Sequence, residues 1–248
     1  MRHAKPCPSG SHLHQLCDGR ISRTKGDGRL IKLFVQETIT MSESTEEAVT
    51  SWWRWFTTIA PLIHSLDSTD YPLWDEVVER LKTIHDSLWF EISNENDDGT
   101  REFVFTAEGD IDAFPFADHL ISTAPTVAGW KFVSLKPAMG FEFQTCYEGI
   151  DFDPREMWFL PLENNSAPDS LGIQVGVSDY DSKHKREIQN AVLVILDTAI
   201  GERSAALDID HIEVGRLPND PDGEGYIHLP ELPDYIAFWK RHHPGPSA

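Results

Sequence analysis

Apolar residues of the first well-patterned stretch, which begins near Glu43, recur at intervals of three and four. This is the period of one helix face, and its members are Val49, Trp52, Phe56, Ile59, Ile63 and Leu66. Pro61 is expected to kink or interrupt this helix, and Ser44 with Glu47 has the spacing of a capping box. A second helix is expected over residues 73–87. Together they predict a helical hairpin.

The apolar period then changes to two, which is typical of half-buried strands. A β-hairpin is expected where residues 88–93 and 103–105 flank an Asn-Asp-Asp-Gly turn. Asp112 is expected to cap a short helix that ends before Pro125. Further strands are expected over 130–136, 157–162 and 171–177.

The segment 171–177 has one packed face and one nearly bare face, because Gly172 and Gly176 alternate with apolar residues. Close backbone packing or an exposed sheet surface explains a bare face, and we favour this explanation. The alternative is a docking face for a partner strand, helix or ligand.

Residues 183–200 form the clearest predicted helix, with Gly201 as its C-cap. A strand over 205–214 and a final helix follow. This order predicts an α+β fold in which an N-terminal helical hairpin precedes a mainly antiparallel sheet with helices packed on it. Strand–helix–strand pieces in both halves hint weakly at a duplication. We expect a single domain over 41–240 and a flexible tail over 241–248.

Charge separates the first forty residues from the rest. The chain of 248 residues has a formal net charge of −20, whereas residues 1–40 hold seven basic and three acidic side chains. The remainder therefore carries −24, because the whole carries −20 and this segment +4. We interpret residues 1–40 as disordered or as a mis-annotated extension before Met41. A targeting peptide and a metal cluster are the alternatives, and neither matches a standard pattern.

Acidity also bears on partners and location. It disfavours nucleic acid and acidic membranes, since phosphate groups and anionic lipids are repelled, and it favours a basic protein. Three cysteines without a C-x-x-C pair indicate a reducing compartment. With no apolar stretch long enough to span a bilayer, these features predict a cytoplasmic protein.

Signatures of common enzymes are missing from the sequence: G-x-S-x-G, H-E-x-x-H, the P-loop and the dinucleotide fingerprint. An enzyme is therefore the less favoured class, and we assign no catalytic residue. Asp-x-Asp pairs begin at Asp151, Asp179 and Asp208, and we expect them to be solvated loop carboxylates.

One twelve-residue run resembles an EF-hand calcium loop. Oxygen ligands at alternating positions would come from Asp220, Asp222, Glu224, the backbone of Tyr226, and Glu231. Gly225 permits the sharp turn, and a helix can begin at the last ligand. However, the fifth position holds a glutamate, a strand precedes the loop, and no second loop is found. A turn rich in Pro, Asp and Gly is the alternative.

Several core and turn segments resemble an uncharacterised bacterial protein family, over most of residues 41–214. The segments are residues 52–56, 88–92, 102–107, 124–131, 196–197 and 201–202. The resemblance implies class membership and no activity. We expect a protein-binding, adaptor or immunity-type protein that neutralises a basic partner. The alternative is a protein that binds a divalent cation, Ca²⁺ above all, or a metal-dependent enzyme.

Overall fold

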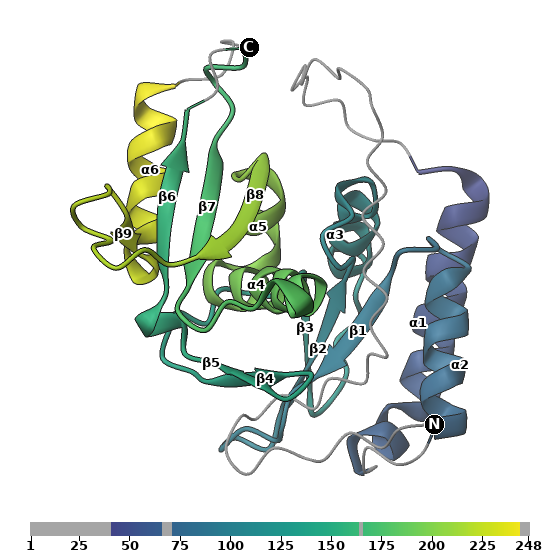
Figure 1. The fold of residues 1–248 in the computed structure, drawn as a ribbon. Coiled ribbons are helices and arrows are strands. Elements are labelled where there is room, and N and C mark those ends of the chain that lie inside the picture. Colours follow the sequence, from purple (N-terminus) through teal and green to yellow (C-terminus); the bar gives the residue numbers. More distant parts are fainter. Residues whose placement is uncertain (1–40, 66–70, 164–165, 244–248) are drawn as a thin grey trace. The chain divides into compact units, whose positions relative to one another are not determined.

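The computed structural model describes residues 41–65, 71–163 and 166–243 (Figure 1). The contacts between these residues divide them into two compact units, with the boundary between Leu135 and Lys136. Each unit is described by itself. The interpretation of residues 1–40 lies outside the described residues, and the single domain over 41–240 stays a prediction.

The unit that ends at Leu135 begins with two helices, followed by a three-stranded sheet. Its elements are α1 (Glu43–Ser65), α2 (Tyr71–Lys82), β1 (Trp89–Ile92), β2 (Arg101–Thr106), the 3-10 turn η1 (Ile111–Ala113), α3 (Phe114–Ser122) and β3 (Trp130–Ser134). Strand β2 is central, antiparallel to β1 and parallel to β3.

Aromatic side chains join α1 to this sheet. The ring of Phe56 lies 5.1 Å from Phe103 of β2 and 5.5 Å from Phe132 of β3, and Trp52 lies 6.0 Å from Phe103. The sequence predicts that both residues of α1 are buried, and both are. Aromatic pairs in this edge-to-face range stabilise a core beyond the area that they bury.

Both predicted helix starts need correction. The hydroxyl of Ser42 accepts the backbone N–H of Thr45 (3.2 Å), so Ser42, and not Ser44, caps α1. Asp110, and not Asp112, accepts a backbone N–H as the cap of η1, from which α3 continues. In each case the capping residue lies two positions before the predicted one. Several polar residues occur near each helix start, and the sequence does not show which of them is the N-cap. Helix α1 runs through Pro61 without interruption.

The second unit contains two sheets and three helices. Its elements are β4 (Thr145–Tyr147), β5 (Ile150–Phe152), η2 (Pro154–Glu156), β6 (Trp158–Leu162), β7 (Gly172–Val177), η3 (Ser182–His184), α4 (Lys185–Ile200), α5 (Glu202–Leu207), β8 (His211–Arg216), β9 (Ile227–His228), η4 (Leu229–Glu231) and α6 (Leu232–His242). The larger sheet has the order β8-β7-β6-β9, in which only β7 and β8 are parallel.

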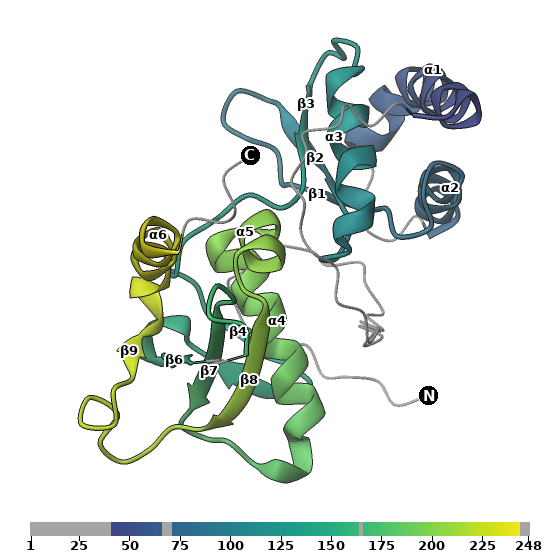
Figure 2. The same ribbon diagram turned by 90° about the horizontal axis from the view of Figure 1, so that it is seen from above.

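One face of the larger sheet carries the core of this unit. Apolar residues of α4 and α6 pack there with Phe159, Ile173 and Val175. Figure 2 shows α4 and α6 on the same side of β6, β7 and β8. The opposite face holds the other alternate side chains of the strands.

The α+β class and the helix pair at the start are confirmed, and most strand pairs are antiparallel. The strand predicted over 205–214 is wrong at its start, because residues up to Leu207 form α5 and β8 begins at His211. Alternating Ala205, Leu207 and Ile209 suggest a strand, but Glu, Arg, Ala and Leu also favour a helix. Strands β4 and β5 are not predicted. Helix α6 reaches His242, inside the segment predicted as a tail.

The two units share one arrangement of strands and helix. In each, an antiparallel pair (β1–β2, β6–β7) is followed by a helix and a strand parallel to the second strand. An aspartate, Asp110 or Asp181, follows each middle strand by four residues and caps a 3-10 turn that opens the helix. The weak sequence hint of a duplication thus corresponds to matching topology and spacing.

Candidate functional site

The face of the larger sheet opposite the core is the candidate site, and we call it the outer face. Strand alternation assigns to it Trp158, Leu160, Leu162, Gly172, Gln174, Gly176, His211, Glu213, Gly215 and His228. It includes the glycine-bearing face of β7 that the sequence singles out. Contacts on the outer face therefore show whether the bare face of β7 is closely packed or open for docking.

Side chains of the same unit cover much of the bare strand. A Cβ placed on Gly176 would lie 2.6 Å from Leu217 and 3.2 Å from the ring of Tyr226. At Gly172 it would lie 3.2 Å from Leu162. Both glycines are buried, so close packing, the favoured explanation, is confirmed at these two positions.

The apolar part of the outer face that remains accessible is a row along β6. Trp158, Leu160 and Leu162 are half-buried, and none belongs to the core on the other side of the sheet. The ring of Trp158 lies 3.7 Å from that of exposed His228 on β9. A Cβ on Gly225 would lie 3.7 Å from Leu160, so the loop between β8 and β9 lies against this row, which is only partly open.

Carboxylates border this row. Glu213 of β8 is exposed and pairs with His211 (3.1 Å) on the same face. The loop between β8 and β9 adds exposed Asp220, Asp222 and Glu224. Burial, and after it the charge of Glu224, raises the pKa of Tyr226, whose ring covers Gly176. No Lys or Arg occurs on the described outer face or in the loop 217–226.

The same loop contains four of the five predicted calcium ligands, all except Glu231, and it forms a chain of backbone turns. The backbone N–H groups of Glu224 and Gly225 donate to the carbonyls of Asp220 and Asp222, each at 3.1 Å. Oδ1 of Asp220 accepts the N–H of Gly223 (3.1 Å), so this carboxylate folds over its own loop. Gly225 has φ +83°, as the predicted sharp turn requires.

The elements on either side of the loop match the EF-hand pattern in part. A helix follows, because Glu231 ends η4 directly before α6, and a strand, β8, precedes the loop. Among the residues that the structure describes, no three His, Cys, Asp or Glu side chains are grouped to hold a metal ion. Calcium binding through Asp220, Asp222, Glu224, Tyr226 and Glu231 stays a prediction.

One aspartate of each Asp-x-Asp pair serves local structure. Asp153 and Asp181 each accept a backbone N–H at the start of a 3-10 turn, and Asp210 accepts the N–H of Leu171 (3.0 Å). Hydrogen bonds from the Arg155 guanidinium hold the pKa of Asp153 well below its usual range. These contacts account for Asp153, Asp181 and Asp210 without a ligand.

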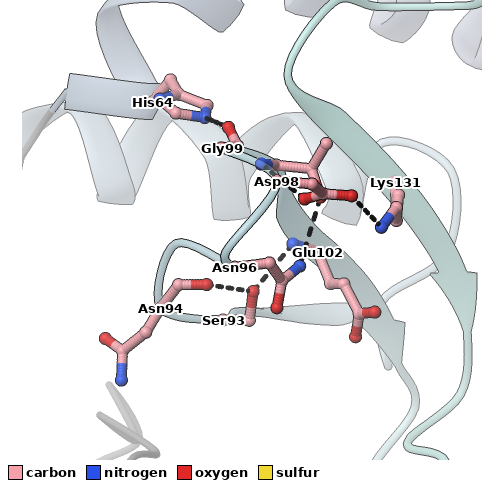
Figure 3. A network of polar contacts seen from close by, with 9 residues as sticks. His64, Ser93, Asn94, Asn96, Asp98, Gly99, Glu102 and Lys131 are labelled. Atoms are coloured by element: carbon pink, nitrogen blue, oxygen red, sulfur yellow. Dashed lines mark hydrogen bonds and ion pairs between the residues drawn. The ribbon is translucent and has the colours of Figure 1, made fainter.

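A network of polar contacts surrounds the turn between β1 and β2 (Figure 3). Asp98 accepts the backbone N–H of Thr100 (3.0 Å) and pairs with Nζ of Lys131 (2.9 Å). The ring of His64 lies 3.2 Å from the carbonyl oxygen of Gly99, which ties the turn to the end of α1. The groups satisfy one another, so we interpret the network as structural.

The acidic border of the outer face is not predicted from the sequence. Its members come from β8 and from the loop 217–226, and their arrangement depends on the turn that returns the chain to β6 as β9. The signal that the sequence does contain is the alternation of Gly172 and Gly176 with apolar residues in one strand, after the continuous apolar run 158–162. That pattern identifies a face, whereas its charged border requires the strand order.

The chain matches no protein-family model, no curated protein and no solved structure. This outcome agrees with the resemblance to an uncharacterised family and assigns no activity. Among the described residues, no helix has both the length and the apolar character needed to cross a membrane.

Proposed function

We propose that this protein is an acidic binding protein, of the adaptor or immunity type, whose partner is a basic protein. The observation that carries the proposal is the half-buried apolar row of Trp158, Leu160 and Leu162 on a face that holds carboxylates and, among the described residues, no Lys or Arg. A charge-complementary partner associates faster with such a surface, and wrong partners of like charge are rejected.

The remaining charge of the chain supports the same partner. Residues from Met41 onward carry −24, so long-range attraction favours a cationic protein over the whole surface. The same charge repels phosphate backbones and anionic lipids, and we therefore propose neither nucleic acid nor a membrane as a partner.

Affinity capture tests this function. The full chain is immobilised and exposed to a lysate of its native host at about 0.15 M salt, where the Debye length is about 8 Å. Each retained protein is then purified and titrated against the chain. We expect at least one protein of net positive charge to bind, with affinity that falls as salt rises. If no positively charged protein binds at physiological salt, the proposal is wrong.

We also propose a cytoplasmic location, which rests on the small number and spacing of the cysteines. Cys146 of β4 is disulfide-bonded in the structure. The oxidation state of the cysteines in cells therefore tests the proposed location. Alkylation of the native protein without reduction, followed by mass spectrometry, should modify all three cysteines. Protection of Cys146 from alkylation would contradict a reducing compartment.

A further inference from the structure

We propose that the open edge of β8 is a docking site for an extended segment of the basic partner, which adds to the larger sheet as a further strand. This inference rests on the proposed function and names the part of the sheet that binds the partner. The segment that fits this edge alternates basic and apolar side chains.

Strand β8 lies at one edge of the larger sheet and pairs with β7 on its inner side (Figure 1). At the start of the pair the backbone N–H of His211 donates to the carbonyl of Leu171 (3.3 Å), and at its end the N–H of Leu217 donates to the carbonyl of Val177 (3.0 Å). In a parallel pair a strand directs every second residue toward its neighbour. The odd-numbered residues of β8 therefore bond to β7.

The other residues of β8 direct their backbone groups away from β7. They are Ile212, Val214 and Arg216, and no hydrogen bond to their N–H or C=O groups occurs among the described residues. Unpaired groups of this kind, repeated about every 6.6 Å along a strand, are a template for another strand. The edge therefore offers donors and acceptors that an extended chain can pair with.

The two edges of the larger sheet differ in how well they are blocked. Strand β9 has two residues, and Pro230 follows it two positions later. Strand β8 has six residues and contains neither Pro nor Lys, which proteins commonly use to block an edge. The loop after β8 lies on the outer face, where Leu217 and Tyr226 cover Gly176. It leaves the edge of β8 uncovered.

Charge favours a basic segment at this edge. Residues 208–224, which contain β8, hold six acidic residues and a single basic one, Arg216. Lys240 pairs with Asp208 and His211 with Glu213, but the stretch as a whole stays acidic. Cross-strand pairs of opposite charge stabilise a sheet, and like charges directly opposite each other destabilise it. A second copy of the chain, with the same acidic stretch, is therefore a poorer occupant than a basic segment.

A defined peptide tests this edge. The probe is a synthetic peptide of alternating Lys and Val. Its matched control has the same sequence with N-methyl groups on alternate amides, in either phase, which removes the hydrogen-bond donors of one edge and keeps every side chain. A second control has Glu in place of each Lys. Each is titrated into isotopically labelled full chain at about 0.15 M salt, and the perturbed backbone amides are mapped by NMR.

Two variants of β8 separate the backbone from the side chain. Val214→Pro removes an N–H that points away from β7, and proline is tolerated on an edge strand in this position. Val214→Ala shortens the same side chain and keeps the N–H. Thermal melting shows whether each variant is folded, and the N-methylated peptides test the same hydrogen bonds on the unaltered chain.

We expect the amides of Ile212, Val214 and Arg216 to exchange rapidly with solvent in the free chain and slowly with the Lys and Val peptide bound. The largest shifts should fall on β8. The Glu peptide and at least one of the two N-methylated peptides should bind about tenfold more weakly or not at all. Val214→Pro should weaken binding about tenfold, and Val214→Ala about twofold.

No binding of the Lys and Val peptide, shifts centred elsewhere, or equal binding of all four peptides would overturn the assignment of this edge. Slow exchange of the three amides in the free chain would overturn it as well, because the edge would already be paired. None of these results touches the proposed function, which fails only if host capture returns no basic protein.

Discussion

Lys136 and Glu202 are joined by two reciprocal hydrogen bonds. The backbone N–H of Lys136 donates to Oε2 of Glu202 (3.1 Å), and the backbone N–H of Glu202 donates to the carbonyl of Lys136 (3.0 Å). Glu202 is completely buried. The first residue of the second unit is thereby fastened to the junction of α4 and α5, close to the core that supports the outer face.

Replacing Glu202 by Ala should destabilise the protein, because the N–H of half-buried Lys136 loses this acceptor. The expected loss in the free energy of unfolding is about 1–3 kcal/mol. Glu202→Gln keeps an acceptor oxygen and should cost less. Urea denaturation of both variants measures the difference. An Ala variant as stable as the wild type would show that this contact is not needed.

Gly201, between α4 and α5, should tolerate no side chain. Its backbone angles, φ 84° and ψ 146°, lie in a region that only glycine adopts readily, and a Cβ would lie 3.0 Å from the backbone nitrogen of Ala138. Gly201→Ala should therefore cost about 2–4 kcal/mol. Gly140→Ala is the matched control, since Gly140 has φ +76° and a Cβ there would meet nothing within 4 Å.

We expect Gly140→Ala to lower the free energy of unfolding by about 1 kcal/mol, because the positive φ strains the backbone but no atom lies close to the added Cβ. Thermal or urea unfolding distinguishes the two variants. Equal losses would mean that the segment around Ala138 moves freely away from Gly201.

Asp98 should make stability depend on pH in the acid range. The Thr100 hydroxyl, and after it Lys131, donate hydrogen bonds that hold the pKa of Asp98 well below its ordinary value of 3.8. The folded state thus binds this proton more weakly than the unfolded state. Ionised Asp98 therefore contributes to the free energy of unfolding at pH values above its ordinary pKa of 3.8. This contribution is lost as the pH falls through and below that value.

Asp98→Asn should therefore lower the urea midpoint at pH 7, and the gap to the wild type should close towards pH 2. Asp97→Asn, with the same change of charge at an exposed neighbour, serves as the control. A gap that stays constant across this pH range would contradict the linkage.

The loop from Asp220 to Glu231 retains a calcium prediction that is separate from partner binding. If its ligand spacing is functional, millimolar Ca²⁺ should raise the melting temperature, and Asp220→Ala and Glu231→Ala should abolish the shift. Asp234→Ala, at an exposed acid in the first turn of α6, controls for the loss of charge. Calorimetry that detects no binding at millimolar Ca²⁺ would end the prediction.

The sequence predicts an element well where its period is long and undisturbed. Helix α1 is expected because Trp52 and Phe56 belong to a stripe that repeats over many turns, and α4 because Gly201 ends a regular apolar stripe. Short elements such as β4 and α5 are too brief for a period to be decisive. The predicted caps are misplaced by two residues, since several polar residues near a helix start satisfy the same pattern.

The candidate site is predictable only in outline. Gly172 and Gly176 alternate with apolar residues in a way that identifies a sheet face, but the burial of Gly176 depends on Leu217 and Tyr226, which lie forty residues or more further along the chain. The acidic border likewise depends on strand order, because Glu213 reaches the face through the parallel pairing of β8 with β7. Long-range pairing of this kind leaves no local signal in a sequence.

The salt dependence of partner binding tests the central claim most directly. The dissociation constant of the basic protein that host capture returns is measured for the wild type and for Glu213→Lys between about 0.05 M and about 0.5 M salt. For the wild type we predict tight binding at low salt that weakens steeply as salt rises, and for Glu213→Lys weak binding with a shallower dependence. Identical curves for the two proteins would contradict an acidic docking site on the outer face.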